Sequence, residues 1–133
     1  MKILFVCTGN SFRSPVAEAL LKKLRKDIEV KSAGTEPAYR IASNAKELLK
    51  EENALAYLKE KPEALNHETI AEADLIIVME EKQRQEIIRR YSPNVEENIR
   101  VWNIEDPLFL PPGRDKVVFE IIKRKVEGLA SSL

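Results

Sequence analysis

Short runs of mostly apolar residues recur at four places along the chain. Runs of this length predict buried strands, because a parallel strand that is covered on both faces carries few polar side chains. The four predicted strands are Ile3–Val6, Ile28–Ser32, Leu75–Met79 and Ile99–Asn103.

Between these runs, apolar residues recur at intervals of three and four, which is the spacing of one helix face. The first helix should begin at Ser14-Pro15, because serine is a good N-cap and proline is favoured at the first helical position. Asn66 should cap a short helix that reaches Ala73. The other predicted helices are Ser43–Glu52, Glu81–Arg90 and Asp115–Leu129.

Strands that alternate with helices predict right-handed crossover units and therefore an α/β fold. We expect a four-stranded parallel sheet with helices on both faces, in a single domain that spans residues 1–133. In such sheets, ligands bind beyond the carboxyl ends of the strands. Cys7, Gly34, Met79 and Asp106 stand at or after those ends, so we expect the functional residues to meet at this edge.

The charge balance limits the partners that the chain can attract. Lys and Arg number 22, as do Asp and Glu, which argues against bulk electrostatic binding of nucleic acid or anionic lipid. No apolar run has the length of a membrane span, and the N-terminal run is too short for a signal peptide. The single cysteine cannot form an intrachain disulfide and suits a reducing compartment. We therefore expect a cytoplasmic protein, a monomer or weak dimer, without a nucleic-acid or membrane partner.

The segment Cys7–Arg13 carries the clearest candidate chemistry, with five residues between the cysteine and the arginine. Such a loop can close around an oxyanion, because its backbone N–H groups and the following helix N-terminus can point inward. Gly9 allows unusual backbone angles, and Arg13 can donate to two phosphate oxygens at once. The same positive field should keep Cys7 as a thiolate at neutral pH, able to attack phosphorus without a histidine base.

Cys7 also has a plainer interpretation as a small apolar residue at the end of a strand, which is the commoner role of a single buried cysteine. A Cys-x5-Arg pattern by itself is weakly specific. Its position between a strand and a Ser-Pro helix start makes it a strong indication of a phosphate-binding loop.

Four segments extend this indication over nearly the whole chain. They are Val6–Ala19 (VCTGNSFRSPVAEA), Ser32–Thr35 (SAGT), Ala73–Met79 (ADLIIVM) and Asp106-Pro107. Together they resemble the low-molecular-weight protein tyrosine phosphatase family. The resemblance implies the α/β fold above, a phosphatase loop between the first strand and the first helix, and an enzyme that needs no metal or cofactor.

The resemblance also implies roles for residues that match the family motifs. Cys7 would attack phosphorus and carry a phosphocysteine, and Arg13 would bind the phosphoryl oxygens. Asp106 would protonate the leaving oxygen and then deprotonate the attacking water, although Asp106-Pro107 could be a simple loop turn. The implied substrate is a phosphorylated protein or a small aryl phosphate.

Other residues of the loop would support this chemistry. Ser14 would hydrogen-bond the sulfur of Cys7, a role compatible with capping the helix, and Asn10 would lock the loop with Ser32 as its partner. The implied phosphate-binding set is Thr8, Gly9, Asn10, Ser11, Phe12 and Ser14.

Several positions depart from the family pattern. Phe12 stands where relatives carry a second cysteine, and Ser11 stands where tyrosine-specific members carry an aliphatic residue. Leu108 and Phe109 replace two tyrosines after the Asp-Pro pair. Phe109 and Tyr39 are candidate walls of the substrate pocket, with core packing and plain surface exposure as the respective alternatives.

The polar Ser11 leaves the substrate open. Arginine-phosphate phosphatases of the family carry Thr at this position, and related arsenate reductases carry Ser. The alternatives to a phosphotyrosine phosphatase are therefore a protein arginine phosphatase and an arsenate reductase, which with one cysteine would depend on external thiols. A non-catalytic phosphate-binding module is a third alternative, disfavoured by the intact set of Cys7, Arg13, Ser14 and Asp106.

Oxidation of Cys7 should stop at the sulfenic acid or at a mixed disulfide with an external thiol, because Phe12 replaces the partner cysteine. Mass spectrometry of peroxide-treated protein, with and without added glutathione, checks this expectation. A covalent dimer as the main product in the presence of glutathione would contradict it.

Overall fold

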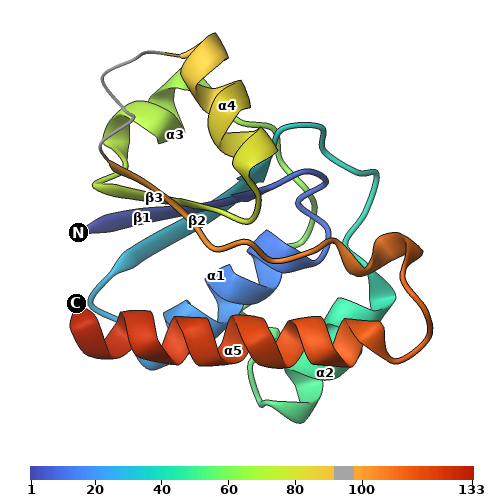
Figure 1. Ribbon diagram of the computed structural model, residues 1–133. Coiled ribbons are helices and arrows are strands. Elements are labelled where there is room, and N and C mark those ends of the chain that lie inside the picture. Colours follow the sequence, from blue (N-terminus) through green and yellow to red (C-terminus); the bar gives the residue numbers. More distant parts are fainter. Residues whose placement is uncertain (92–97) are drawn as a thin grey trace.

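The computed structural model describes residues 1–91 and 98–133, and it is an α/β fold around one parallel sheet. Pro93, which follows the fourth main helix in the sequence, lies outside these residues. The strands are β1 (Lys2–Cys7), β2 (Glu29–Gly34), β3 (Leu75–Val78) and β4 (Ile99–Val101), in the order β2-β1-β3-β4. Every neighbouring pair is parallel, as predicted (Figure 1).

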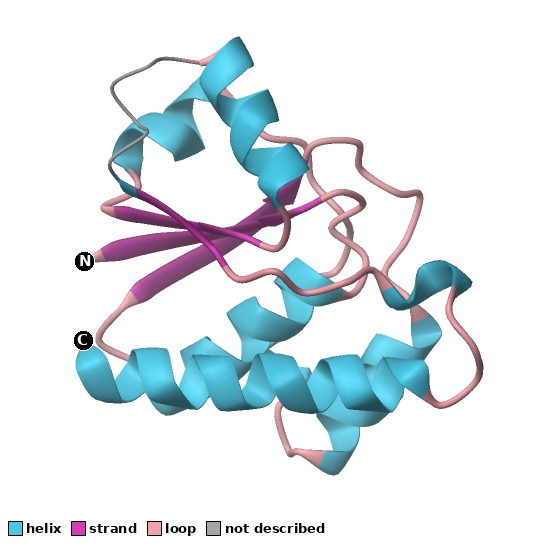
Figure 2. Ribbon diagram, viewed as in Figure 1, coloured by secondary structure: helices cyan, strands magenta, loops and turns pink. Residues whose placement is uncertain are grey.

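Helices cover both faces of the sheet, which confirms the predicted fold class (Figures 1 and 2). The helices are α1 (Arg13–Leu24), α2 (Ser43–Glu51), α3 (His67–Glu72), α4 (Glu81–Arg90) and α5 (Arg114–Ser132). Short 3-10 turns among the described residues include η1 (Leu55–Tyr57) and η3 (Pro107–Phe109). Figure 2 shows α1, α2 and α5 on one side of the sheet and α3 and α4 on the other.

Alternation along β1 divides its side chains between two apolar clusters. Ile3, Phe5 and Cys7 belong to the larger cluster with α1, α2 and α5. Leu4 and Val6 belong to the smaller cluster on the other face, with residues of α3 and α4. The period of the strand therefore directs the Cys7 side chain toward the N-terminal end of α1.

The start of α1 differs from the prediction. The helix begins at Arg13 with Phe12 as its N-cap residue, so Ser14 is not the cap and Pro15 is the third helical residue. The hydroxyl of Ser14 contacts Cys7 and Asn10 instead. The sequence rule failed here because the side chain that should cap the helix is used inside the loop.

Other boundaries move by a few residues. β2 extends to Gly34, two residues beyond the predicted end, and β4 ends at Val101 because the chain turns at Asn103, whose φ is 55°. Asn66 caps α3 as predicted, since its side chain accepts a hydrogen bond from the Thr69 N–H at 2.8 Å.

Gly34 joins the end of β2 to the loop after β1. A Cβ at this position would lie 2.5 Å from the Thr8 carbonyl oxygen and 3.0 Å from the Asn10 nitrogen. The backbone of Gly34 also donates to Glu63 and accepts from Leu65. Only glycine allows the loop, the strand and the segment before α3 to approach this closely. In the part of the chain that the structure describes, no helix is long and apolar enough to cross a membrane.

We predict that Gly34→Ala lowers the free energy of unfolding by about 1–3 kcal/mol, because a backbone atom must move to admit the methyl group. Gly128→Ala is the matched control, since a Cβ there meets nothing within 4 Å in α5. It should raise stability by up to about 1 kcal/mol, as expected for a helix interior. Urea unfolding of both variants measures the difference, and equal stabilities would refute the close approach at Gly34.

Candidate active site

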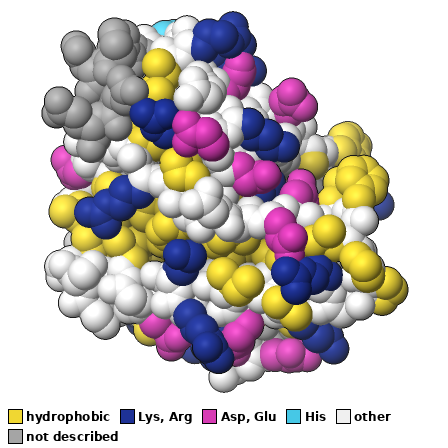
Figure 3. All heavy atoms as spheres, viewed as in Figure 1, with side chains coloured by type: hydrophobic (Ala, Val, Ile, Leu, Met, Phe, Trp, Pro, Cys, Tyr) yellow, Lys and Arg dark blue, Asp and Glu magenta, His cyan; other side chains and the backbone are white. Residues whose placement is uncertain are grey.

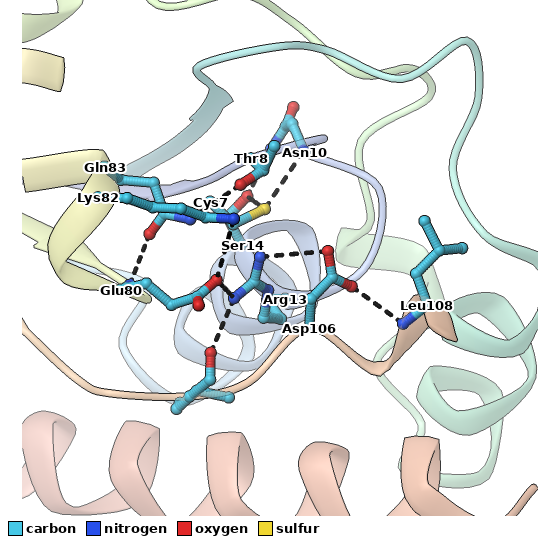
Figure 4. Close-up of polar contacts among 11 residues, drawn as sticks. Cys7, Thr8, Asn10, Arg13, Ser14, Glu80, Lys82, Gln83, Asp106 and Leu108 are labelled. Atoms are coloured by element: carbon cyan, nitrogen blue, oxygen red, sulfur yellow. Dashed lines mark hydrogen bonds and ion pairs between the residues drawn. The ribbon is translucent and has the colours of Figure 1, made fainter. Parts of the chain in front are cut away.

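The phosphate-binding loop, residues 7–13, runs from the last residue of β1 to the first residue of α1 (Figure 4). Asn10 adopts a left-handed conformation with φ of 51°, and its N–H donates to the Cys7 sulfur at 3.2 Å. This turn folds the loop back over Cys7. Because α1 starts within the loop, the free N–H groups of its first turn add positive potential at the same place.

The Asn10 side chain connects three segments of the protein. Its Nδ2 donates to the hydroxyls of Ser14 at 2.8 Å and Ser32 at 3.0 Å. Its Oδ1 accepts from Lys59 Nζ at 2.7 Å and from the Glu63 N–H at 2.9 Å. An asparagine amide has two hydrogens and two lone pairs on its oxygen, so all its hydrogen-bonding capacity is used.

The Ser14 hydroxyl and the Cys7 sulfur lie 2.9 Å apart, and in the thiol form either could donate. A thiolate can only accept, so the serine hydrogen is directed to the sulfur when Cys7 is ionised, while Ser14 Oγ accepts from Asn10 Nδ2. A donor aimed at sulfur stabilises the thiolate relative to the thiol.

Arg13 is almost fully buried, at 2% exposure, and its guanidinium is held by fixed acceptors. Nη1 donates to Glu80 Oε1 at 2.6 Å and to the Ile104 carbonyl at 2.8 Å. Nη2 lies 3.5 Å from Asp106 Oδ2 (Figure 4). These contacts fix the orientation of the planar guanidinium. A guanidinium with a fixed plane can donate two parallel hydrogen bonds to a phosphoryl group.

Asp106 lies across the pocket from the loop, just before η3. Its Oδ1 accepts from the Leu108 N–H at 3.0 Å, while Oδ2 faces Arg13. The side chain is 43% exposed, so the carboxyl group can reach both solvent and the pocket. This arrangement suits a group that exchanges protons with a leaving oxygen and with water.

One pocket of about 220 Å³ collects these groups. Its polar lining is Cys7, Ser11, Arg13, Asn44 and Asp106. Its apolar lining is Gly9, Phe12, Ala38, Ala42, Pro107 and Leu108. The pocket therefore has nucleophile, cation and carboxylate together, between walls that are mostly apolar.

The two candidate pocket walls lie outside the pocket lining. Tyr39 and Phe109 do not line the pocket, and their neighbours Ala38 and Leu108 do. Tyr39 is 97% exposed and Phe109 93% exposed, because Tyr39 projects from a surface loop and Phe109 from the turn η3. Hydrophobic side chains gather at the right-hand edge of Figure 3, the side on which η3 lies in Figure 1.

Some predicted phosphate-binding residues lie behind the pocket. Asn10 and Ser14 are completely buried, and Ser32 lies on β2 beneath them. Thr8 Oγ1 accepts from Gln83 Nε2 at 3.0 Å, which ties the loop to α4. Ser11 lines the pocket and its hydroxyl donates to the Arg40 carbonyl at 2.9 Å.

The sequence interpretation missed four polar residues of this region: Glu18, Lys59, Glu80 and Gln83. Glu80 and Gln83 had a usable signal, since a side-chain acceptor followed three residues later by Glu or Gln marks a helix start. Lys59 had none, because it lies in a charged stretch that resembles an exposed surface, and Glu18 is a single acidic residue in the apolar part of the first helix, where nothing indicates its partners. Among the described residues, no group of three or more His, Cys, Asp or Glu side chains could hold a metal ion.

Comparison with known proteins agrees with this geometry. A family model for low molecular weight phosphotyrosine protein phosphatase matches residues 2–133. The protein-arginine-phosphatase of Bacillus subtilis (strain 168) is 35% identical over 97 residues, which cover 68% of this chain and 63% of that protein. The probable low molecular weight protein-tyrosine-phosphatase EpsP of Ralstonia nicotianae is 30% identical over 133 residues, 95% of this chain and 91% of EpsP.

The fold has a similar counterpart among solved structures. The YwlE arginine phosphatase, as a Cys-to-Ser mutant with a phosphorylated active-site serine, matches with a TM-score of 0.89 and 26% identity. The match covers 100% of this chain and 95% of that chain. With the family model, it confirms the resemblance carried by the loop motif: this chain belongs to the low molecular weight phosphotyrosine protein phosphatase family of hydrolases, with Cys7 in the phosphate-binding loop.

Proposed function

We propose that this protein hydrolyses phosphorylated protein side chains, phosphotyrosine above all, through a phosphocysteine at Cys7. The observation that carries the proposal is the pocket itself. Cys7, Arg13 and Asp106 line one cavity, and the Cys7 sulfur accepts hydrogen bonds from Ser14 and from the Asn10 N–H. A nucleophile, an oxyanion-binding cation and a proton donor in one pocket are the groups that phosphoryl transfer needs.

In the first step, the phosphoryl oxygens bind Arg13 and the backbone N–H groups of the loop. The Cys7 thiolate attacks phosphorus, a sulfur–phosphorus bond forms and the bond from phosphorus to the leaving oxygen breaks. Protonated Asp106 gives its proton to that oxygen, which departs as a neutral hydroxyl group. The positive charge of Arg13 and of the α1 N-terminus offsets the charge that develops on the equatorial oxygens.

In the second step, Asp106 accepts a proton from water as the water oxygen attacks phosphorus. The sulfur–phosphorus bond breaks, inorganic phosphate forms and Cys7 departs as a thiolate. The Ser14 hydroxyl, directed at the sulfur at 2.9 Å, stabilises the leaving thiolate and so favours this step. The protein then returns to its starting state.

The shape of the pocket supports an aromatic phosphoester. Ala38, Ala42, Pro107 and Leu108 give the pocket an apolar lining, so a phenol ring can be buried there while its phosphate reaches Cys7. We further propose a cytoplasmic location, because the single cysteine, Cys7, suits a reducing compartment, and a monomer or weak dimer as the oligomeric state.

Phosphoarginine is the second candidate substrate, and Ser11 is the observation that favours it. Its hydroxyl oxygen lies in the pocket lining with the carboxylate of Asp106. A phosphorylated guanidinium has several N–H groups that need hydrogen-bond acceptors, whereas an aromatic ring has none. The similarity to the protein-arginine-phosphatase of Bacillus subtilis and to the structure of the YwlE arginine phosphatase also supports this alternative.

Cys7→Ser should abolish hydrolysis of phenyl phosphate, because an alcohol in this loop is a far weaker nucleophile than a thiolate. Asp106→Asn should lower kcat by roughly a hundredfold or more through loss of the general acid. Asp27→Asn is the control, since that exposed carboxylate pairs with Arg25 away from the pocket. Steady-state release of phosphate measures all three, and wild-type activity in Cys7→Ser would disprove the proposal.

The two candidate substrates can be separated with peptides of one sequence that carry either phosphotyrosine or phosphoarginine. We expect the higher kcat/KM with phosphotyrosine. Ser11→Val should lower activity toward phosphoarginine more than toward phosphotyrosine, because it removes an acceptor that the ring does not use. A higher kcat/KM with phosphoarginine, reduced by Ser11→Val, would establish the second candidate instead.

A further inference from the structure

Lys59 is a nearly buried lysine behind the phosphate-binding loop, with a side chain that is 8% exposed. It follows η1 and precedes Ala64, which pairs with Gly34 at the end of β2. Its Nζ lies 2.7 Å from Asn10 Oδ1, 2.8 Å from the Ser32 carbonyl and 2.9 Å from Glu63 Oε1. An ammonium group has three hydrogens, so each is directed at one acceptor. Such complete pairing is what allows a buried cation.

The ammonium group decides which way the Asn10 amide faces. Lys59 has only donors, and the Glu63 N–H on the same side of the amide is also a donor. A rotation of the amide by half a turn would place its NH₂ group against both of them. The oxygen of Asn10 is therefore held toward Lys59, and the NH₂ group is held toward Ser14 and Ser32.

The orientation of the Asn10 amide determines where the hydroxyl hydrogen of Ser14 points. Because Asn10 donates to Ser14 Oγ at 2.8 Å, the serine hydrogen is free for the Cys7 sulfur at 2.9 Å. In the rotated amide, Asn10 Oδ1 would attract that hydrogen and the sulfur would lose its donor. Two carboxylates lie next to this hydrogen-bond network, and both have partners. Glu63 pairs with Lys59, and Glu18 accepts from Ser32 at 2.5 Å.

We infer that Lys59 is a positioning residue that directs the Ser14 hydroxyl to the Cys7 thiolate by fixing the side-chain amide of Asn10. This inference rests on the proposed role of Cys7 as the nucleophile. Lys59 is not among the residues that line the pocket. It acts through two intervening side chains, Asn10 and Ser14.

The test is the rate at which iodoacetamide alkylates Cys7 at pH 6, which reports the thiolate without any phosphatase turnover. Lys59→Met should slow alkylation about tenfold, the effect of losing a hydrogen bond to a charged acceptor. Lys61→Met is the matched control, because that lysine is exposed two residues away, and its rate should equal that of the wild type. If Lys59→Met is alkylated at the wild-type rate, the inference is overturned, whether or not the protein is an active phosphatase.

A double-mutant cycle tests the route through Ser14. In a Ser14→Ala background, Lys59→Met should cause no further slowing, because the hydroxyl that Lys59 directs is gone. An equal slowing in both backgrounds would overturn the inference, since Lys59 would then act by another path. Thermal unfolding checks that each variant is folded. If Lys59→Met is not folded, Lys59→Gln takes its place in the cycle.

Rescue by a conservative substitution separates positioning from general packing. Lys59→Arg keeps a cation with donors only, so it should alkylate within about twofold of the wild-type rate. A folded Lys59→Arg protein that is as slow as Lys59→Met would overturn the inference. Absence of phosphatase activity in the wild-type protein, with alkylation rates that change among the variants as expected, would instead count against the proposed function alone.

Discussion

Four hydrogen bonds to the side-chain amide of Asn10 hold the active site in place. They join the loop after β1, the end of β2 and the segment around Lys59, which are far apart in sequence. The residue is completely buried and has a left-handed φ of 51°, a conformation that asparagine tolerates better than most residues. A buried amide with any of these partners missing would be costly, so the loop has one stable arrangement.

The arrangement of charge around the pocket follows from this loop and from the sheet edge. Arg13 is held by Glu80 from the start of α4 and by the Ile104 carbonyl after β4, while Asp106 approaches its other nitrogen. These contacts come from beyond the carboxyl ends of β3 and β4, at the edge where parallel sheets bring loops together. The phosphoryl group therefore meets a cation whose position is set by the fold and not by the substrate.

The sheet and its order of strands and helices could be predicted because the chain has short continuous apolar runs, helical segments with apolar residues at intervals of three and four, and one highly specific loop motif. The start of α1 could not, because a serine that satisfies the N-cap rule is used by Cys7 and Asn10. The two interpretations of Tyr39 stayed open, because sequence does not tell an exposed loop aromatic from one that lines a pocket. Lys59 could not be found, because its burial depends on a contact with Asn10 across 49 positions of sequence.

The phosphocysteine is the species on which the whole mechanism depends, and it can be observed directly. Wild-type protein mixed with excess phenyl phosphate is quenched within one turnover in neutral denaturant, digested and examined by mass spectrometry, with Cys7→Ala as the control. The mechanism predicts one phosphoryl group on the peptide that contains Cys7, and none in the control. Turnover by the wild-type protein without a phosphoryl group on that peptide would contradict it.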